Sequence, residues 1–309
     1  MISKSPQNID VLRKPIQFTS SARTAFEIIL RKLDFRRKEC ILLPAYIGIN
    51  DKEGSGVFDP IMSVGIPFEF YSLTKNLSCN LDEVESKLKK GDIKCMLVIH
   101  YFGFPNMDIL KIRDLCHAHE VTLVEDCAHT FHSKFNGQRL GEIGDYSFFS
   151  IHKNYPSETG GILRSNHGQD SSLQLKEEQK ISFEALKVYC TADHNAIAET
   201  LKQNYEKLSD SIKDLKGIEL MFPKLHEGVV PLNMPLLVGG GKREELYFHL
   251  LEKGIPTVAL YYRLIEEIEK SEFPLSYEIS ENIINLPVNQ DLVDSDLNRI
   301  KHTLEEYLK

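Results

Sequence analysis

The sequence predicts an α/β fold: a mostly parallel central sheet flanked by helices, with a smaller C-terminal α+β domain. Three observations support this prediction. Strand-like and helix-like segments alternate through the first half of the chain. Several of the strand-like segments are continuous apolar runs, which are typical of parallel strands buried on both faces. The chain has 309 residues, enough for one large domain and a smaller one.

The elements of the first half follow from their apolar spacing. Residues 22–33 have the spacing of an amphipathic helix, and residues 80–89 have the same pattern with Asn80 as an N-cap. A further helix is expected at residues 106–119. The strands expected from short apolar or alternating runs are residues 40–43, 66–71, 94–99, 121–125, 146–151 and 161–163.

In the second half, the polar residues 164–180 are expected to form an exposed loop, and residues 181–216 contain no proline or glycine and predict one long helix. A boundary near residue 200 within this helix divides the chain into a large domain, 1–200, and a small domain, 201–309. The small domain is expected to contain strands at 218–221, 229–237 and 255–260, and helices at 242–253 and 291–308.

The composition indicates an acidic, globular chain. It has 37 Lys plus Arg against 45 Asp plus Glu, a formal net charge of −8, and no long basic run, which argues against binding of nucleic acid. The amino terminus lacks the apolar segment of a signal peptide, and no apolar run approaches the roughly 20 residues that span a membrane. The 6 cysteines form no C-x-x-C pair. A cytoplasmic protein with reduced cysteines and no membrane contact is therefore expected.

Three local signals indicate a cofactor site. Asp126 comes just after the buried strand 121–125, at the sheet edge where α/β proteins bind ligands. Lys153 ends a strand whose other residues are apolar or hydroxylic, and the small residues of 20–24 open a helix, where free N–H groups bind phosphate. A lysine amine, a carboxylate and a phosphate site are the groups that bind pyridoxal phosphate (PLP). The sequence therefore predicts a PLP site.

The order of these segments along the chain resembles the DegT/DnrJ/EryC1/StrS sugar aminotransferase family, which has the PLP-dependent transferase fold type I of aspartate aminotransferase. No single motif is specific, but the ordered set covers most of the chain. The matching segments are Ser20-Ser21-Ala22-Arg23, His100-Tyr101-Phe102-Gly103-Phe104-Pro105-Asn106-Met107-Asp108, Glu125-Asp126-Cys127-Ala128-His129, Gly144-Asp145, Lys153, Gly160-Gly161 and Asn285-Leu286-Pro287.

This resemblance implies a role for each matching residue. Lys153 would hold PLP as a Schiff base and transfer protons during catalysis, and Asp126 would pair with the pyridine nitrogen. His129 stands where the family usually has glutamine and would face the ring oxygen. The remaining residues implied for the cofactor are Ala22 and Arg23 through their backbone amides on the phosphate, Ser150 (or Ser147 in its place) on the phosphate, and Tyr46 stacked on the ring.

Four of these side chains keep a second interpretation when the residues are considered alone. Lys153 also suits an ordinary surface lysine at a strand end, and Asp126 suits a helix cap or an ion-pair partner. The Arg23 guanidinium suits a surface ion pair as well as a phosphate. His129 also suits a core histidine with a backbone partner.

The resemblance also implies a reaction and its partners. The chain would be a PLP-dependent aminotransferase that moves an amino group, supplied by glutamate, to a keto-sugar nucleotide in the biosynthesis of amino-sugars for surface polysaccharides or natural products. Family members are dimers with active sites at the interface, so a homodimer is expected.

Two alternatives stay open. One is a related PLP-dependent sugar dehydratase; that branch replaces the lysine with histidine, so Lys153 argues against it. The other is a non-catalytic homologue that acts as a partner subunit. It is favoured only by the short middle section, which lacks the family's Gly-x-Asn-x-Arg stretch after Gly160-Gly161 and offers only Asn166 nearby.

A cysteine- and histidine-rich segment between residues 116 and 132 raises the possibility of a metal site. Its members are Cys116, His117, His119, Cys127, His129 and His132. Their spacing matches no zinc motif, and His117 and His119 are two apart on a predicted helix, so they point to different sides. No metal is therefore expected.

Overall fold

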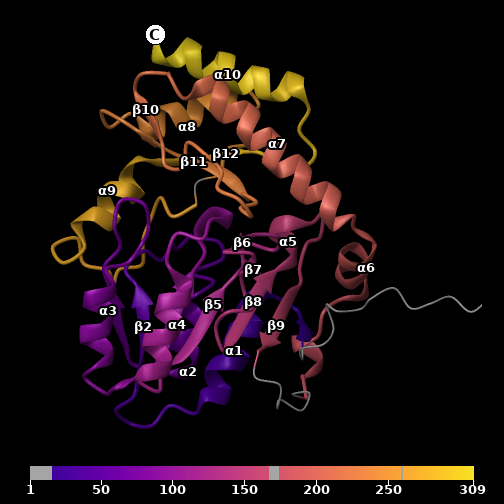
Figure 1. Cartoon of the computed structure of the whole chain (residues 1–309). Coiled ribbons are helices and arrows are strands. Elements are labelled where there is room, and N and C mark those ends of the chain that lie inside the picture. Colours follow the sequence, from indigo (N-terminus) through magenta and orange to yellow (C-terminus); the bar gives the residue numbers. More distant parts are fainter. Residues whose placement is uncertain (1–15, 167–173, 259) are drawn as a thin grey trace, which may run out of the picture.

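A computed structural model describes residues 16–166, 174–258 and 260–309, and its main element is a seven-stranded sheet (Figure 1). The strand order is β1-β9-β8-β5-β4-β2-β3. These strands are β1 (Ile16–Thr19), β2 (Cys40–Pro44), β3 (Phe68–Tyr71), β4 (Ile93–Ile99), β5 (Thr122–Asp126), β8 (Tyr146–Ser150) and β9 (Gly161–Ser165). A short hairpin, β6 (Lys134–Phe135) with β7 (Gln138–Arg139), lies between β5 and β8 in the chain.

The centre of the large sheet is parallel. Strands β3, β2, β4, β5 and β8 pair in parallel, whereas β9 runs antiparallel to β8 and to β1. Every residue of β2 is buried, as are the last five of β4 and the last four of β5. Burial on both faces explains why these strands read as continuous apolar runs. The predicted α/β class with a mostly parallel sheet is confirmed.

Helices cover both faces of this sheet. Helix α1 packs against α2, and α3 packs against α4 (Figure 1). The helices of this part are α1 (Ala22–Leu33), α2 (Phe58–Val64), α3 (Leu81–Leu88), α4 (Ile109–Ala118) and α5 (Ile151–Asn154), with a 3-10 turn at Tyr101–Gly103 and another at Glu177–Gln179. Asn80 caps α3 as predicted, because its side chain accepts the N–H groups of Asp82 and Glu83.

The strand order creates a crevice at one edge of the sheet. The chain leaves β2 toward β3 on one side, and it leaves β4 toward β5 on the other side. The connections therefore diverge between β2 and β4, which is where open α/β sheets bind ligands at the carboxyl ends of the strands.

A second, smaller unit follows in the chain (Figure 1). Its antiparallel sheet, of order β10-β11-β12, carries helices beside it. The elements are β10 (Ile218–Leu220), β11 (Asn233–Val238), α8 (Arg243–Glu252), α9 (Pro274–Asn282), β12 (Ile283–Pro287) and α10 (Asp294–Leu308). The predicted small α+β part is thus present, although the boundary near residue 200 stays a prediction.

Two predicted elements of the second half are wrong. The single helix expected over 181–216 is two helices, α6 (Phe183–Thr191) and α7 (His194–Ile212). Asp193 separates them because its side chain accepts the N–H of Ala196 and starts a new helix. The strand expected at 255–260 is absent from the described residues; of these, Val258 alone forms a bridge, to Asn285. Residue 259 lies outside the described residues.

No helix among the described residues combines the length and apolar character needed to cross a bilayer.

Ser133 joins the two units. Its buried hydroxyl donates to the carbonyl of Gly103 (2.6 Å) and accepts the N–H of Val230 (2.9 Å), just before β11. Ser133→Ala would leave these buried groups without their partner, so we expect the free energy of unfolding to fall by about 2–4 kcal/mol. Urea unfolding measures the loss. Ser211→Ala, which removes one hydrogen bond within α7, is the control; equal effects of both variants would contradict the assignment.

Candidate active site

A cavity of about 610 Å³ opens at the carboxyl ends of the central strands. Asp126 reaches it from the end of β5, and Ser150 from the end of β8. The amino end of α1 forms one wall. The segment 47–57 after β2 and residues 260–262 from the second unit also line the cavity. The cavity therefore lies in the crevice that the strand order creates.

Lys153 contributes an amine to this cavity. It sits in α5, one short turn after β8, and its residue is exposed toward the cavity. Its Nζ lies 2.8 Å from Nε2 of the buried His129. Burial of the amine among protein atoms lowers the pKa of Lys153, against the opposing charges of Asp126 and Glu53. A lysine with a lowered pKa is suited to act as a nucleophile or base.

Asp126 is a buried carboxylate on the same cavity. Its Oδ1 accepts the N–H of Ala128 at 2.8 Å, which orients the side chain. No hydrogen bond to its Oδ2 is present among the described residues, although Asp126 lines the cavity. Burial raises the pKa of Asp126 to about 6, opposed by the Ala128 amide and by the positive charge of Lys153. Its free oxygen is available to a cationic donor on a ligand.

The amino end of α1 forms an anion site on the cavity wall. Ser21 is the N-cap and accepts the N–H of Thr24 at 3.1 Å. The preceding N–H groups, those of Ala22 and Arg23, lie at the helix start, where no carbonyl of the same helix can accept them. The Arg23 guanidinium does not point to a ligand: it bonds to the carbonyl of Glu53 (2.5 Å) and pairs with Asp59 (3.5 Å). The Arg23 side chain therefore makes a surface ion pair, which is the second of the two interpretations given above.

Gly160 and Gly161 bring this helix start against the sheet. The N–H of Gly160 donates to the carbonyl of Ser20 at 2.8 Å. A Cβ on Gly161 would lie 2.3 Å from the carbonyl carbon of Ser21 and 2.5 Å from the nitrogen of Ala22. Only glycine allows this approach, which is the physical reason for the glycine pair in the sequence.

Gly161→Ala should therefore move the helix start and weaken a bound phosphate. We expect the affinity for PLP to fall at least about tenfold, as loss of one hydrogen bond to a charged group implies. Titration of PLP by absorbance or fluorescence measures this. Gly239→Ala is the matched control, because the new Cβ would meet only ordinary contact with Gly217 at 3.6 Å. An unchanged affinity in Gly161→Ala would exclude this helix start as the phosphate site.

Ser150 and Ser147 are separated by strand alternation. Ser150 lines the cavity, and its hydroxyl lies 3.1 Å from Nδ1 of His152. Ser147 is fully buried on the other face of β8, does not line the cavity, and donates to the carbonyl of Gly141 at 2.7 Å. Of the two serines, only Ser150 can reach a ligand in the cavity.

Tyr46 is also placed away from the cavity. It is fully buried, and its ring stacks on that of Tyr261 with 5.1 Å between centroids. Tyr261 lines the cavity and packs its ring against His129 at 5.9 Å. Of these two tyrosines, only Tyr261 lines the cavity. Sequence reasoning missed Tyr261, which lies far along the chain and beside no recognised motif.

Glu125 is fully buried, next to Asp126 but on the opposite face of β5, and it anchors the surroundings of the site. It accepts Nε2–H of His100 at 2.9 Å. Its other donors are the backbone N–H groups of Gly141, Ile143 and Gly144, at 2.6–2.9 Å. Burial alone would raise the pKa of Glu125, but these hydrogen bonds outweigh it and the pKa is lowered.

The Glu125 network also accounts for a group that resembles a metal site. His100, Glu125 and Cys127 bring their ligand atoms within 4.8 Å of one another. Both carboxylate oxygens of Glu125 already accept N–H groups, which occupy the electron pairs that a cation would need. The hydrogen-bond network explains this cluster without a metal.

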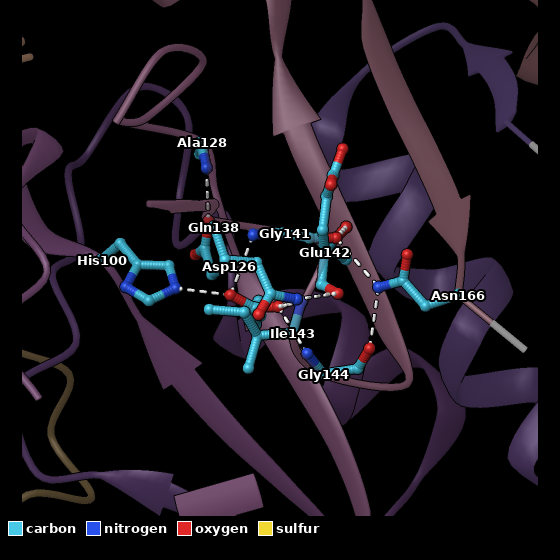
Figure 2. A network of polar contacts seen from close by, with 11 residues as sticks. His100, Asp126, Ala128, Gln138, Gly141, Glu142, Ile143, Gly144 and Asn166 are labelled. Carbon is cyan, nitrogen blue, oxygen red and sulfur yellow. Dashed lines mark hydrogen bonds and ion pairs between the residues drawn. The ribbon is translucent and has the colours of Figure 1, made fainter. Parts of the chain in front are cut away.

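Asn166, the asparagine nearest to the missing family motif, is engaged in the same region (Figure 2). Its amide donates to the carbonyls of Gly141 (2.9 Å) and Gly144 (2.7 Å), and its oxygen accepts from Arg164. It therefore stabilises the 141–144 turn of its own chain.

The residues present fit PLP. A lysine amine, a buried carboxylate with an oxygen free toward the cavity, and a helix start with two free N–H groups all line one space. About 610 Å³ lies within the usual size of small-molecule sites and leaves room beyond the cofactor.

Comparison with known proteins agrees with this geometry. The sequence profile of the DegT/DnrJ/EryC1/StrS aminotransferase family matches residues 18–172. GDP-perosamine synthase of Vibrio cholerae is 27% identical over 75% of this chain and 71% of its own. UDP-4-amino-4,6-dideoxy-N-acetyl-beta-L-altrosamine transaminase of Campylobacter jejuni is 21% identical over 94% of this chain and 84% of its own.

Solved structures share the fold. The aminotransferase TlmJ of Streptoalloteichus hindustanus superposes with a TM-score of 0.80 at 18% identity, over 94% of this chain and 85% of its own. The PLP form of the putative sugar aminotransferase Spr1654 of Streptococcus pneumoniae gives a TM-score of 0.78 at 20% identity, over 96% of this chain and 89% of its own. The chain therefore belongs to the DegT/DnrJ/EryC1/StrS aminotransferase family, a family of PLP-dependent transaminases.

Proposed function

We propose that this protein transfers an amino group from glutamate to a keto-sugar linked to a nucleotide. The observation that carries the proposal is the convergence of Lys153, Asp126 and the start of α1 on one cavity. The names of the relatives support the substrate class, because one of the two described above is named as the synthase of a GDP-linked sugar and the other as the transaminase of a UDP-linked amino-sugar.

Within this proposal, Lys153 holds the cofactor covalently through Nζ. PLP bound there would supply a ring that stabilises negative charge on the substrate carbon. Asp126 Oδ2 would pair with the pyridine nitrogen and keep it protonated, and His129 would face the ring oxygen. The phosphate would be bound by the amides of Ala22 and Arg23 and by the hydroxyl of Ser150.

Lys153 also moves the proton. When it is not bonded to the cofactor, its neutral Nζ would take the proton from the α-carbon of the amino donor. In the second half of the reaction, the same nitrogen would deliver a proton to the sugar carbon that receives the amine. The lowered pKa of Lys153 supports this role, because only an unprotonated amine accepts a proton.

The test is a coupled assay with glutamate and a series of nucleotide-linked keto-sugars. Formation of 2-oxoglutarate together with an amino-sugar nucleotide, identified by mass spectrometry, is the expected result. Loss of a hydroxyl group without gain of an amine would indicate the dehydratase-like alternative. A protein that forms no covalent adduct with PLP would be the non-catalytic homologue.

The remaining proposals concern assembly and compartment. We propose a homodimer in which a second copy covers the exposed side of the cavity at Glu158 and Thr159. Light scattering with and without PLP tests this, and a monomer under both conditions would exclude it. A cytoplasmic location fits six unpaired cysteines, four of them buried.

A further inference from the structure

We propose that the backbone N–H of Phe102 fixes His129 as a neutral Nε2–H donor, and that this donor holds the free amine of Lys153 unprotonated. The inference rests on the proposed role of Lys153 as the cofactor lysine. It makes Phe102 a positioning residue for His129, and through His129 for the base of the reaction.

The first step is the tautomer of His129. The N–H of Phe102 lies 3.2 Å from Nδ1 of His129 in hydrogen-bonding geometry. A backbone amide can only donate, so Nδ1 must offer a lone pair. The single proton of a neutral imidazole then resides on Nε2. Burial lowers the pKa of His129 well below its usual value and keeps the ring neutral.

The second step is the protonation state of Lys153. Nε2 of His129 lies 2.8 Å from Nζ of Lys153. An ammonium group has three N–H bonds and no lone pair, so it cannot accept from Nε2–H. Only the neutral amine satisfies both nitrogens. The charges of Asp126 and Glu53 favour the ammonium form, whereas burial disfavours it, and the His129 donor adds to the effect of burial.

The backbone of Phe102 is held in an uncommon conformation that presents this N–H. Phe102 is fully buried and has φ +58°, in the left-handed region that bulky residues rarely adopt. Its carbonyl accepts the N–H of Leu232 at 2.8 Å. Gly103 packs so closely on Val230 that a Cβ on Gly103 would lie 2.6 Å from the carbonyl oxygen of Val230. The segment 230–232 thus clamps the turn, with Ser133 bonded to both sides.

The ring of His129 is also fixed between two aromatic side chains. Phe102 stacks on it with 6.1 Å between centroids, and Tyr261 contacts it edge-on at 5.9 Å. A glutamine at position 129 offers the same pair of groups, a carbonyl that accepts from Phe102 and an amide that donates to Lys153. A glutamate offers acceptors alone, and this difference provides the experiment.

The tautomer is measured by ¹⁵N NMR on full-length, cofactor-free protein labelled at histidine. His129→Gln identifies the His129 signals by their loss. The expected result is an unprotonated Nδ1 and a protonated Nε2 from pH 6 to 8. A protonated Nδ1, alone or in a doubly protonated ring, would overturn the proposal.

The state of Lys153 is measured by competitive acetylation across pH, with each lysine quantified by peptide mass spectrometry and the exposed Lys38 as reference. His129→Gln should keep the profile of the wild-type protein. His129→Glu should move it up by at least about one pH unit, slowing acetylation about tenfold below the transition. Identical profiles in all three proteins would overturn the proposal.

The two proposals fail separately. If His129→Glu does not fold, as judged by circular dichroism, the NMR result on the unaltered protein still decides the tautomer. Borohydride reduction of the protein with bound PLP attaches the cofactor to the lysine that holds it. If that lysine is not Lys153, the proposed cofactor role is wrong, while the NMR and acetylation results remain valid for the cofactor-free protein.

Discussion

Lys153→Ala is expected to abolish covalent binding of PLP and to reduce transaminase activity by at least about 10³-fold. Two losses combine in this variant. Of the two lysines that line the cavity among the described residues, Lys52 and Lys153, the one whose amine lies 2.8 Å from His129 is removed. The group that moves the proton disappears with it. The measurement is the glutamate half-reaction, followed by the absorbance of the cofactor.

Borohydride reduction of the wild-type protein with PLP should fix the cofactor to the peptide that contains Lys153. Lys38→Ala, at an exposed position before β2, is the control and should behave as wild type. Attachment of the cofactor to Lys52 instead, which also lines the cavity, would refute the proposed arrangement.

Asp126→Asn is expected to lower activity by about 10²–10³-fold, the usual cost of removing a preorganised charge from the reacting centre. The asparagine keeps the size of the side chain, and its carbonyl oxygen can still accept the N–H of Ala128. It carries no negative charge to hold a proton on the pyridine nitrogen. Activity equal to wild type would show that Asp126 does not face that nitrogen.

The same variant should make the cofactor-free protein more stable. The pKa of Asp126 in the folded protein is about 6, above the value near 3.9 of an unfolded aspartate. The protonated Asp126 carboxyl contributes to the free energy of unfolding. This contribution is fully present below about pH 4 and is lost as the pH rises through about 6. Asparagine has no such loss, so Asp126→Asn should be up to about 3 kcal/mol more stable at pH 7.

Thermal or urea unfolding at pH 4 and pH 7 measures this difference, which should vanish at the lower pH. Asp34→Asn is the control, because Asp34 is an exposed residue at the end of α1 whose left-handed backbone conformation asparagine also adopts. A variant at position 126 that is less stable than wild type at pH 7 would mean that the carboxylate is paired in the cofactor-free protein.

Much of the fold was predictable because the residues of buried elements are apolar and can be recognised in the sequence. Strands β2, β4 and β5 are covered on both faces, so they appear as apolar runs that end at a polar residue. Two errors arose for different reasons. The side chain of Asp193 starts a new helix inside a continuous helical pattern. Residues 255–258 pair with β12 through a single bridge, which is too little to form a strand.

Local sequence determined which chemical groups this protein carries and in what order: the serines and amides that open α1, Asp126 at a strand end, Lys153 after the next strand, and a glycine pair beyond it. Tertiary structure alone decided which of them face one another. Strand alternation turns Ser150 into the cavity and Ser147 away from it, and Tyr261 arrives from a segment 215 positions beyond Tyr46 to cover it. The backbone of Phe102, bent by the second unit, selects the tautomer of His129, because a hydrogen bond depends on positions in space that residue order does not contain.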